Sequence, residues 1–311
     1  MDIGIAAAFI ATILASTVRL ATPLIYAALG EVFTERSGVL NIGLEGIMLF
    51  GAFTGFAVAS FSGSRDLGLL AGILVGVLIG LLFGFFAITI KANQIVVGAA
   101  LNMFGMGMTG FLYRSLFTST VHGISAYPPI NIPLLSQIPV LGQVLFQHNI
   151  LVYASVVLVA VSSFILYRTA FGLSVRSIGE HPKAADTAGI NVILFRYTCC
   201  MIGGALAALG GAYLTIAHTN QFVENITSGR GFIALAVVVF GRWKPWGAFW
   251  ASLLFGVFYA LQLQMQAMTN NTAIPYQIWQ ALPYLATLIV LISLRGRSAA
   301  PKVLGVPYEA S

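Results

Sequence analysis

The sequence predicts an all-α protein that crosses a lipid bilayer several times and forms one membrane domain over residues 1–311. Of its 311 residues, 59% are hydrophobic and 8% are charged, whereas a soluble domain carries about 25% charged residues. The basic residues lie mainly near the ends of apolar runs. A soluble fold could not bury so much apolar surface, so we expect a helical bundle in a membrane.

Nine apolar runs are candidates for membrane-spanning helices. The seventh has only about eleven residues, and a helix of that length covers about half of a bilayer core. We therefore expect about eight to ten spans, one of them a broken or short helix. The runs are Ile3 to Leu29, Val39 to Phe61, Leu67 to Ile90, Ile95 to Phe117, Asn149 to Tyr167, Tyr197 to Ala217, Gly231 to Gly241, Gly247 to Met268 and Ile278 to Leu294.

The distribution of Lys and Arg predicts the orientation. Counting nine crossings puts residues 30–38, 91–94, 168–196 and 242–246 and the tail from Arg295 on one side. These segments carry Arg36, Lys91, Arg168, Arg176, Lys183, Arg196, Arg242, Lys244, Arg295, Arg297 and Lys302, against Arg65, Arg114 and Arg230 on the other side. Basic residues favour the cytoplasm, so we expect the N-terminus outside and the C-terminus inside.

A polar segment, residues 168–196, lies between two apolar runs and is expected in the cytoplasm. Within it, Pro182 to Ala188 predicts a short helix, because proline suits a first helical position and Gly189 can end the helix with a positive φ. Two turns span about 10 Å, too little to cross a bilayer. We therefore expect this helix at the water interface, with its exposed residues available to a partner.

Other features favour structural interpretations. Glycines recur at every fourth position in one run, a spacing that lets helix backbones approach closely. They are Gly68, Gly72, Gly76, Gly80 and Gly84.

The proline-containing segment 118–148 is expected to be an external loop that either caps the helix ends or meets a ligand-delivering partner. The sequence contains no HExxH, GxSxG or phosphate-binding GxxxxGK[ST] motif and no Cys/His cluster, so we expect neither catalysis, a metal, nor bound ATP in this chain.

Few polar residues interrupt the apolar runs. Asn41 and Glu45 are four apart and would share a helix face; Glu45 either serves the substrate pathway or lies at the cytoplasmic end beside Arg36. Gln94 and Asn102 either line the pathway or hydrogen-bond between helices. Gln262 is a further pathway candidate, in a row with Gln264 and Gln266. For Glu224 and Arg230, a local salt bridge in the outer loop is favoured.

Four motifs carry a resemblance to a known family. They are GEVFTERSGVLNIGLEGIMLFGAF, ANQIVVGAALNMF, RSIGEHPKAADTAGI and GRGFIALAVVVFGRWKPWGAFWASLLFG, and the likeness runs from about Thr17 to Leu294. The chain resembles the permease subunits of bacterial ABC importers of the branched-chain amino acid and ribose family, and most closely their nucleoside-type branch. In this chain His181 stands where relatives often carry Asn.

The resemblance implies a multi-pass protein of the bacterial inner membrane with several partners. These would be a second homologous permease, a cytoplasmic ATPase that binds ATP and Mg²⁺, and an extracytoplasmic lipoprotein or periplasmic binding protein that delivers a small molecule. No nucleic acid is expected. The segment 168–196 would hold the helix that couples to the ATPase, with the matching motif residues Gly179, Glu180, Pro182, Ala185, Asp186, Ala188 and Gly189.

The substrate and mechanism leave alternatives open. Uncharged polar groups in the spans favour a nucleoside, while a permease for simple sugars or branched-chain amino acids shares most of the motif set. An ATP-independent secondary transporter would need a coupling-ion site, usually a mid-span acid or histidine. An intramembrane enzyme would need a catalytic set that the sequence does not show.

Overall fold

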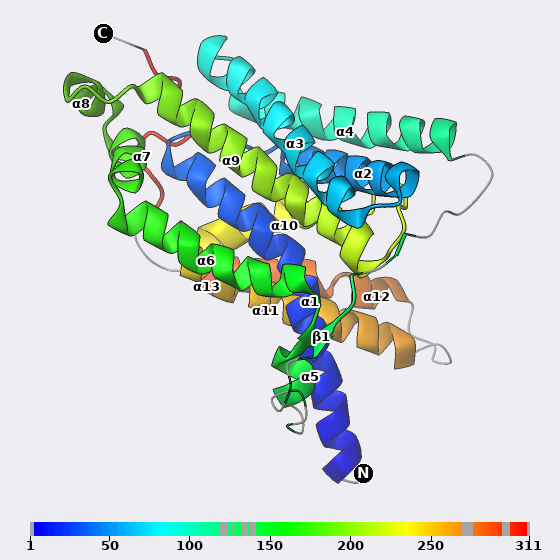
Figure 1. Cartoon of the computed structure of the whole chain (residues 1–311). Coiled ribbons are helices and arrows are strands. Elements are labelled where there is room, and N and C mark those ends of the chain that lie inside the picture. Colours follow the sequence, from blue (N-terminus) through cyan, green and yellow to red (C-terminus); the bar gives the residue numbers. More distant parts are fainter. Residues whose placement is uncertain are drawn as a thin grey trace.

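The structure is a computed structural model that describes residues 3–117, 124–125, 127–131, 133, 136, 138, 141–268, 276–293 and 299–309. Its described part is a bundle of helices (Figure 1), with one antiparallel pair of two-residue strands, β1 (Ile130–Asn131) and β2 (Gln147–His148). The predicted all-α fold is thus confirmed. Parts of the expected external loop 118–148 lie outside the described residues.

Each of the nine apolar runs coincides with one or two helices. Among the described residues, seven helices are long and apolar enough to cross a membrane, and α10 is an apolar helix of 11 residues, as expected for the seventh run. The ninth run divides into α12 and α13. The helices are α1 (Ile3–Arg36), α2 (Leu44–Ser62), α3 (Arg65–Gly84) continued by the π-helix Phe85–Thr89, α4 (Gln94–Leu116), α5 (Leu141–Leu145), α6 (Ile150–Arg168), α7 (Ala170–Glu180), α8 (Pro182–Thr187), α9 (Val192–Tyr213) continued by the π-helix Leu214–His218, α10 (Arg230–Phe240), α11 (Pro245–Met268), α12 (Tyr276–Gln280) and α13 (Leu282–Ser293).

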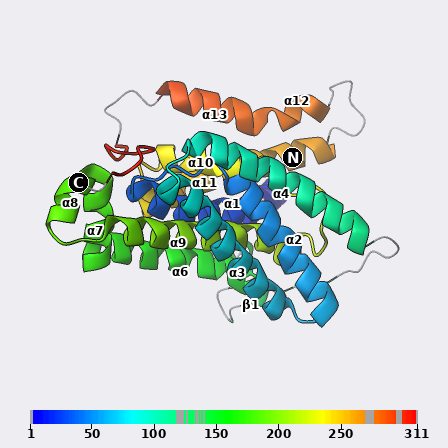
Figure 2. The ribbon, with the colours of Figure 1, turned by 90° about the horizontal axis from the view of Figure 1, so that it is seen from above.

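The helices surround a central group formed by α1, α2, α9, α10 and α11. The largest apolar cluster joins these five helices through residues such as Leu24, Met48, Ala208, Val237 and Phe255, all buried. Seen from above, α12 and α13 lie along one side of the bundle, and α6 with α9 lies on the opposite side (Figure 2). The broken helix α10 is therefore in the interior, where its backbone is shielded from lipid.

The connecting segments gather at two ends of the bundle. At one, which we call the α8 end, Gly179 O accepts from Val303 N at 3.1 Å and Gly38 O accepts from Gly305 N at 3.0 Å. At the other, the β1 end, Ile124 N donates to Asn220 O at 3.3 Å. The segments that the count of nine crossings places on the same side therefore meet in space.

One boundary prediction is wrong. The first apolar run was expected to end at Leu29, but α1 continues to Arg36. Glu31 and Glu35 are 0% and 2% exposed, and each carboxylate accepts one hydrogen bond from the protein. Asn41 precedes α2, so Asn41 and Glu45 do not share a helix face either.

The glycines of α3 lie against α2 and α9. A Cβ added at Gly76 would lie 2.3 Å from Gly204 O, and one at Gly80 would lie 2.3 Å from Cys200 O. Gly68 is equally close to the backbone of α2, where a Cβ would lie 2.4 Å from Gly55 O. A Cβ at Gly72 would lie 3.1 Å from Gly51 O, and one at Gly84 3.1 Å from the Tyr197 ring. The backbones approach this closely because no side chain separates them.

We predict that Gly76→Ala lowers thermal stability in detergent, because the added methyl group would force the backbones of α3 and α9 apart, at a cost of about 1–3 kcal/mol. The matched control is Gly107→Ala in α4, where a Cβ would meet nothing within 4 Å; it should unfold at the wild-type temperature or slightly above. Equal melting of both variants would contradict the packing role of Gly76.

Candidate functional site

The polar segment 168–196 forms two helices at the α8 end. Thr169 begins α7, its hydroxyl accepting from Gly172 N at 3.2 Å. The helix ends before Pro182 because a residue that precedes proline avoids the helical region, and His181 has φ −147° and ψ 79°. Pro182 starts α8, and Gly189, with φ +84°, ends it. The short helix predicted at residues 182–188 is confirmed.

Most of α8 is exposed, and one residue anchors it. Ala185 is buried in a cluster with Ile178, Val192 and Tyr308. Lys183, Ala184, Thr187, Ala188 and Gly189 are exposed, while Glu180 and Asp186 are partly buried. A helix with one buried contact and an open outer surface has the form of a docking element.

The tail 299–309 runs back across the α8 end and holds α8 in place. Tyr308 Oη donates to Asp186 Oδ2 at 2.7 Å, and this bond raises the pKa of Tyr308. Arg196, which is 1% exposed, donates to Ser37 O at 3.2 Å and to Val306 O at 3.3 Å. The tail thus connects α8 with α9 and with the end of α1.

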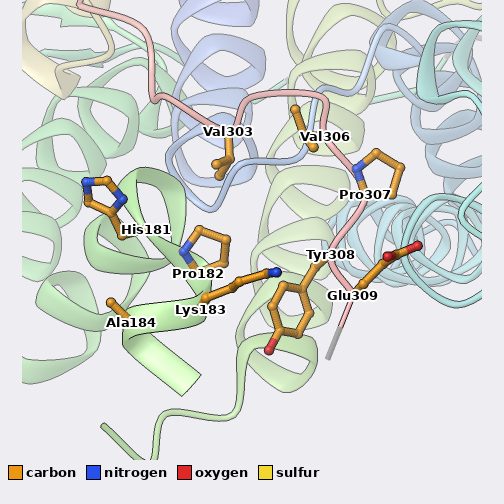
Figure 3. Close-up of a pocket in the computed structure, with 9 residues that line it drawn as sticks. All are labelled: His181, Pro182, Lys183, Ala184, Val303, Val306, Pro307, Tyr308 and Glu309. Carbon is orange, nitrogen blue, oxygen red and sulfur yellow. The ribbon is translucent and has the colours of Figure 1, made fainter. Parts of the chain in front are cut away.

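A groove of about 520 Å³ lies between α8 and the tail. His181, Pro182 and Lys183 form one wall, and Val306, Pro307, Tyr308 and Glu309 face them across the opening (Figure 3). The groove therefore borders the predicted docking element.

Three predicted pathway amides lie around the non-helical residues 37–43. Gln94 Oε1 accepts from Leu40 N at 2.8 Å. Asn102 Oδ1 accepts from Gly46 N at 2.8 Å and its Nδ2 donates to Ile42 O at 2.9 Å. Asn41 Oδ1 accepts from Gly43 N at 2.9 Å. All three side chains are buried, and they satisfy backbone groups that no helix pairs; a pathway role for them stays a prediction.

Glu45 connects two helix N-termini. It lies in the first turn of α2 and is 2% exposed. Its Oε1 accepts from Thr227 Oγ1 at 2.5 Å and from Gly229 N at 2.7 Å, and its Oε2 accepts from Gly231 N at 2.7 Å. A carboxylate between two N-termini is stabilised by both helix dipoles and by charge-assisted hydrogen bonds. A pathway role for Glu45 likewise stays a prediction.

Two buried acids were missed because they lie in residues 30–38, which were placed in a cytoplasmic segment beyond the first apolar run. Glu31 Oε1 accepts from Asn41 N at 2.9 Å, and Glu35 accepts from Trp243 Nε1. Arg36 Nε donates to Trp243 O at 2.9 Å. Together they fasten the end of α1 to the α1–α2 connection and to the turn between α10 and α11. Their four-residue spacing was a usable signal, because it places both acids on one helix face.

A polar cavity of about 330 Å³ opens beside the start of α10. Gln262, one of the predicted pathway residues, lines it. Arg230 lines it as well, with its guanidinium 5.2 Å from the centre of the Tyr259 ring. The full lining consists of Leu20, Ser228, Arg230, Tyr259, Gln262, Leu263 and Tyr284.

The favoured salt bridge between Glu224 and Arg230 is wrong. Glu224 pairs with Arg114 at 3.7 Å. Arg230 Nη1 donates instead to Ile226 O at 3.0 Å and to Thr227 O at 3.1 Å. Because Gly229 and Gly231 bind Glu45, Arg230 is held at the buried start of α10 and not in the outer loop.

Among the described residues, no group of three His, Cys, Asp or Glu side chains could hold a metal.

We predict that Glu45→Gln lowers the free energy of unfolding by about 2–4 kcal/mol, because the amide nitrogen cannot accept from a backbone N–H and buried donors would lose their partners. Thermal unfolding in detergent measures the change. The matched control is Glu224→Gln, which removes an exposed acid and should change the stability by less than about 1 kcal/mol. If both variants unfold at the wild-type temperature, Glu45 does not join the two helices.

Comparisons with known proteins agree on one family. The family described as "Branched-chain amino acid transport system / permease component" matches residues 13–291. The guanosine ABC transporter permease protein NupQ of Bacillus subtilis (strain 168) is 41% identical over 308 residues, which cover 95% of this chain and 96% of the relative. A relative from Haloferax volcanii, described provisionally as a glucose ABC transporter permease protein, is 36% identical, with 91% of each chain covered. The guanosine ABC transporter permease protein NupP of B. subtilis is 25% identical over 84% of this chain and 76% of its own. A family match of this extent shows that the chain belongs to this permease family, and its long apolar helices make it a multi-pass protein of the inner membrane.

Proposed function

We propose that this chain is the transmembrane permease subunit of an ATP-driven ABC importer that takes up nucleosides. The observation that carries the proposal is the 41% identity to a guanosine permease over nearly the full length of both chains. The chain would form a single membrane domain, and the sequence contains no ATP-binding motif. The chain would therefore bind no cofactor itself, and ATP and Mg²⁺ would be bound by a partner ATPase.

A simple sugar is the second candidate substrate. The relative described as a glucose permease is 36% identical, and a sugar shares the hydroxyl groups of a nucleoside's ribose. A branched-chain amino acid is less well matched, because its two charged groups would each need an opposite charge. An ATP-independent secondary transporter is disfavoured, because both carboxylate oxygens of Glu45 already accept hydrogen bonds from the protein.

The proposed importer contains two permease chains, a cytoplasmic ATPase and an extracytoplasmic binding protein. Two different guanosine permease proteins of B. subtilis both resemble this chain, at 41% and 25% identity. This supports a pair of homologous but distinct permeases. The α8 end would then face the cytoplasm, which places the N-terminus outside in agreement with the positive-inside rule.

In this proposal α8 docks on the ATPase and transmits its movement to the bundle. The docking segment would comprise Gly179, Glu180, Pro182, Ala185, Asp186, Ala188 and Gly189. Ala188 and Gly189 are exposed and could contact the ATPase, whereas Gly179 and Ala185 are buried and would hold the segment on the bundle. The tail makes hydrogen bonds to both the docking segment and the α1–α2 connection. A shift of α8 would therefore move α1 and α9, and the closely packed α3 would move with α9 as one body.

The uptake of radiolabelled guanosine tests the proposed function. Membrane vesicles would contain this chain, its neighbouring permease and ATPase, and a purified binding protein. We expect ATP-dependent uptake that excess unlabelled nucleoside blocks and that excess leucine leaves unchanged. Block by glucose or ribose alone would favour the sugar alternative, and uptake without ATP would contradict the ABC importer.

The coupling role of the segment predicts that Glu180→Ala lowers uptake in these vesicles by about fivefold or more, the effect of losing about 1 kcal/mol of coupling between sites. The matched control is Glu224→Ala, an acid at the β1 end. Both variants must reach the membrane with their partners, which a pull-down verifies. Full uptake by the Glu180 variant would show that the docking segment lies elsewhere.

A further inference from the structure

The polar cavity lies in the half of the bundle that is away from the α8 end. At a rise of about 1.5 Å per residue, Arg230 is about 16 Å and Tyr259 about 21 Å along their helices from the α8 end. Leu20, on α1, is about 24 Å from the same end. A bilayer core is about 30 Å thick, so the cavity is at membrane depth and is not part of an external loop.

The polar groups of this cavity come from segments that are distant in the sequence. Ser228 and Arg230 belong to the start of α10, Tyr259 and Gln262 to α11, and Tyr284 to α13. An ionisable side chain within a membrane is costly unless a function or a partner retains it. Arg230 lies between Gly229 and Gly231, which both donate to the Glu45 carboxylate, so one basic and one acidic side chain lie close together beside the cavity.

A site with this lining suits an uncharged aromatic solute. The Tyr284 side chain is 55% exposed, so its ring is accessible from the cavity that it lines. The Tyr259 ring already carries the Arg230 guanidinium at 5.2 Å. A purine or pyrimidine stacks well on a tyrosine ring, and the amide of Gln262 can both donate to and accept from the edge of a base. A volume of about 330 Å³ is within the range of small-molecule sites, about 300–1,000 Å³.

We propose that this polar cavity is a binding site for the base of a nucleoside during transport, with Tyr284 as the stacking surface and Gln262 as the hydrogen-bonding group. The inference rests on the proposed function, because it assumes that a nucleoside enters the membrane domain. A simple sugar has no aromatic ring to stack on Tyr284, so the same geometry favours a nucleoside as the main solute.

Photolabelling tests the site directly. Vesicles that contain the full importer would be illuminated with radiolabelled 8-azidoguanosine, and the labelled peptides of this chain identified by mass spectrometry. We expect label on the peptides that carry Tyr259 and Gln262 or Tyr284, and protection by excess guanosine. Label confined to other parts of the chain would overturn the site.

A pair of glutamine variants supplies the matched control. Gln262→Leu should reduce labelling and guanosine uptake by about tenfold, the effect of losing one or two hydrogen bonds. Gln264→Leu, on the same helix but outside the lining, should leave both near the wild-type level. If the wild type takes up guanosine but the two variants are equally labelled, the site is wrong and the proposed function survives. If the wild type takes up no nucleoside, the proposed function fails first.

Discussion

The carboxylate of Glu45 provides hydrogen-bond acceptors for backbone N–H groups that lie inside the bundle, and the arrangement of the bundle depends on this pairing. Backbone groups inside a bilayer need partners within the protein, yet α2 and α10 both begin in the interior. The free N–H groups at the start of α10 donate to the buried Glu45 carboxylate, which accepts from Gly229 and Gly231, while Gly43 and Gly46 at the start of α2 donate to the side chains of Asn41 and Asn102. A Cβ at Gly231 would lie 2.4 Å from Glu45 N, so only glycine permits this approach. The broken helix therefore depends on one acid and one glycine that are distant in the sequence.

The same break provides space for a cavity. Because α10 has only 11 residues, it covers about half of the bilayer core, and the irregular residues 219–229 complete the crossing. Irregular backbone carries polar groups into the membrane, where a continuous helix would have presented apolar side chains. The Arg230 guanidinium, fixed by two carbonyl groups of this segment, is the clearest example. Interrupting the helix thus places polar chemistry at a depth that a solute must cross.

Local pattern predicted most of the fold and less of the site. Each of the nine apolar runs located one or two helices, and Pro182 with Gly189 defined α8, because hydropathy and helix-end chemistry act over short distances. Charge was misleading for Glu31, Glu35 and Arg36, which were placed after the end of the first run although α1 includes all three. The partners of Glu45 could not be predicted, since they depend on how segments more than 180 residues apart pack together.

The tail shows why a docking helix needs more than its own contacts. A two-turn helix with one buried residue, Ala185, would be free to pivot on that residue. Tyr308 fixes Asp186 from one side, and the backbone of Val303 binds Gly179 on the other. The neighbouring Gly305 then binds Gly38, next to the end of α1. Asp186 in α8 and Gly179 near the end of α7 are thus held separately. In the proposed importer, a force on the outer surface of α8 would therefore reach α1 through this chain of hydrogen bonds instead of being lost in a local rotation.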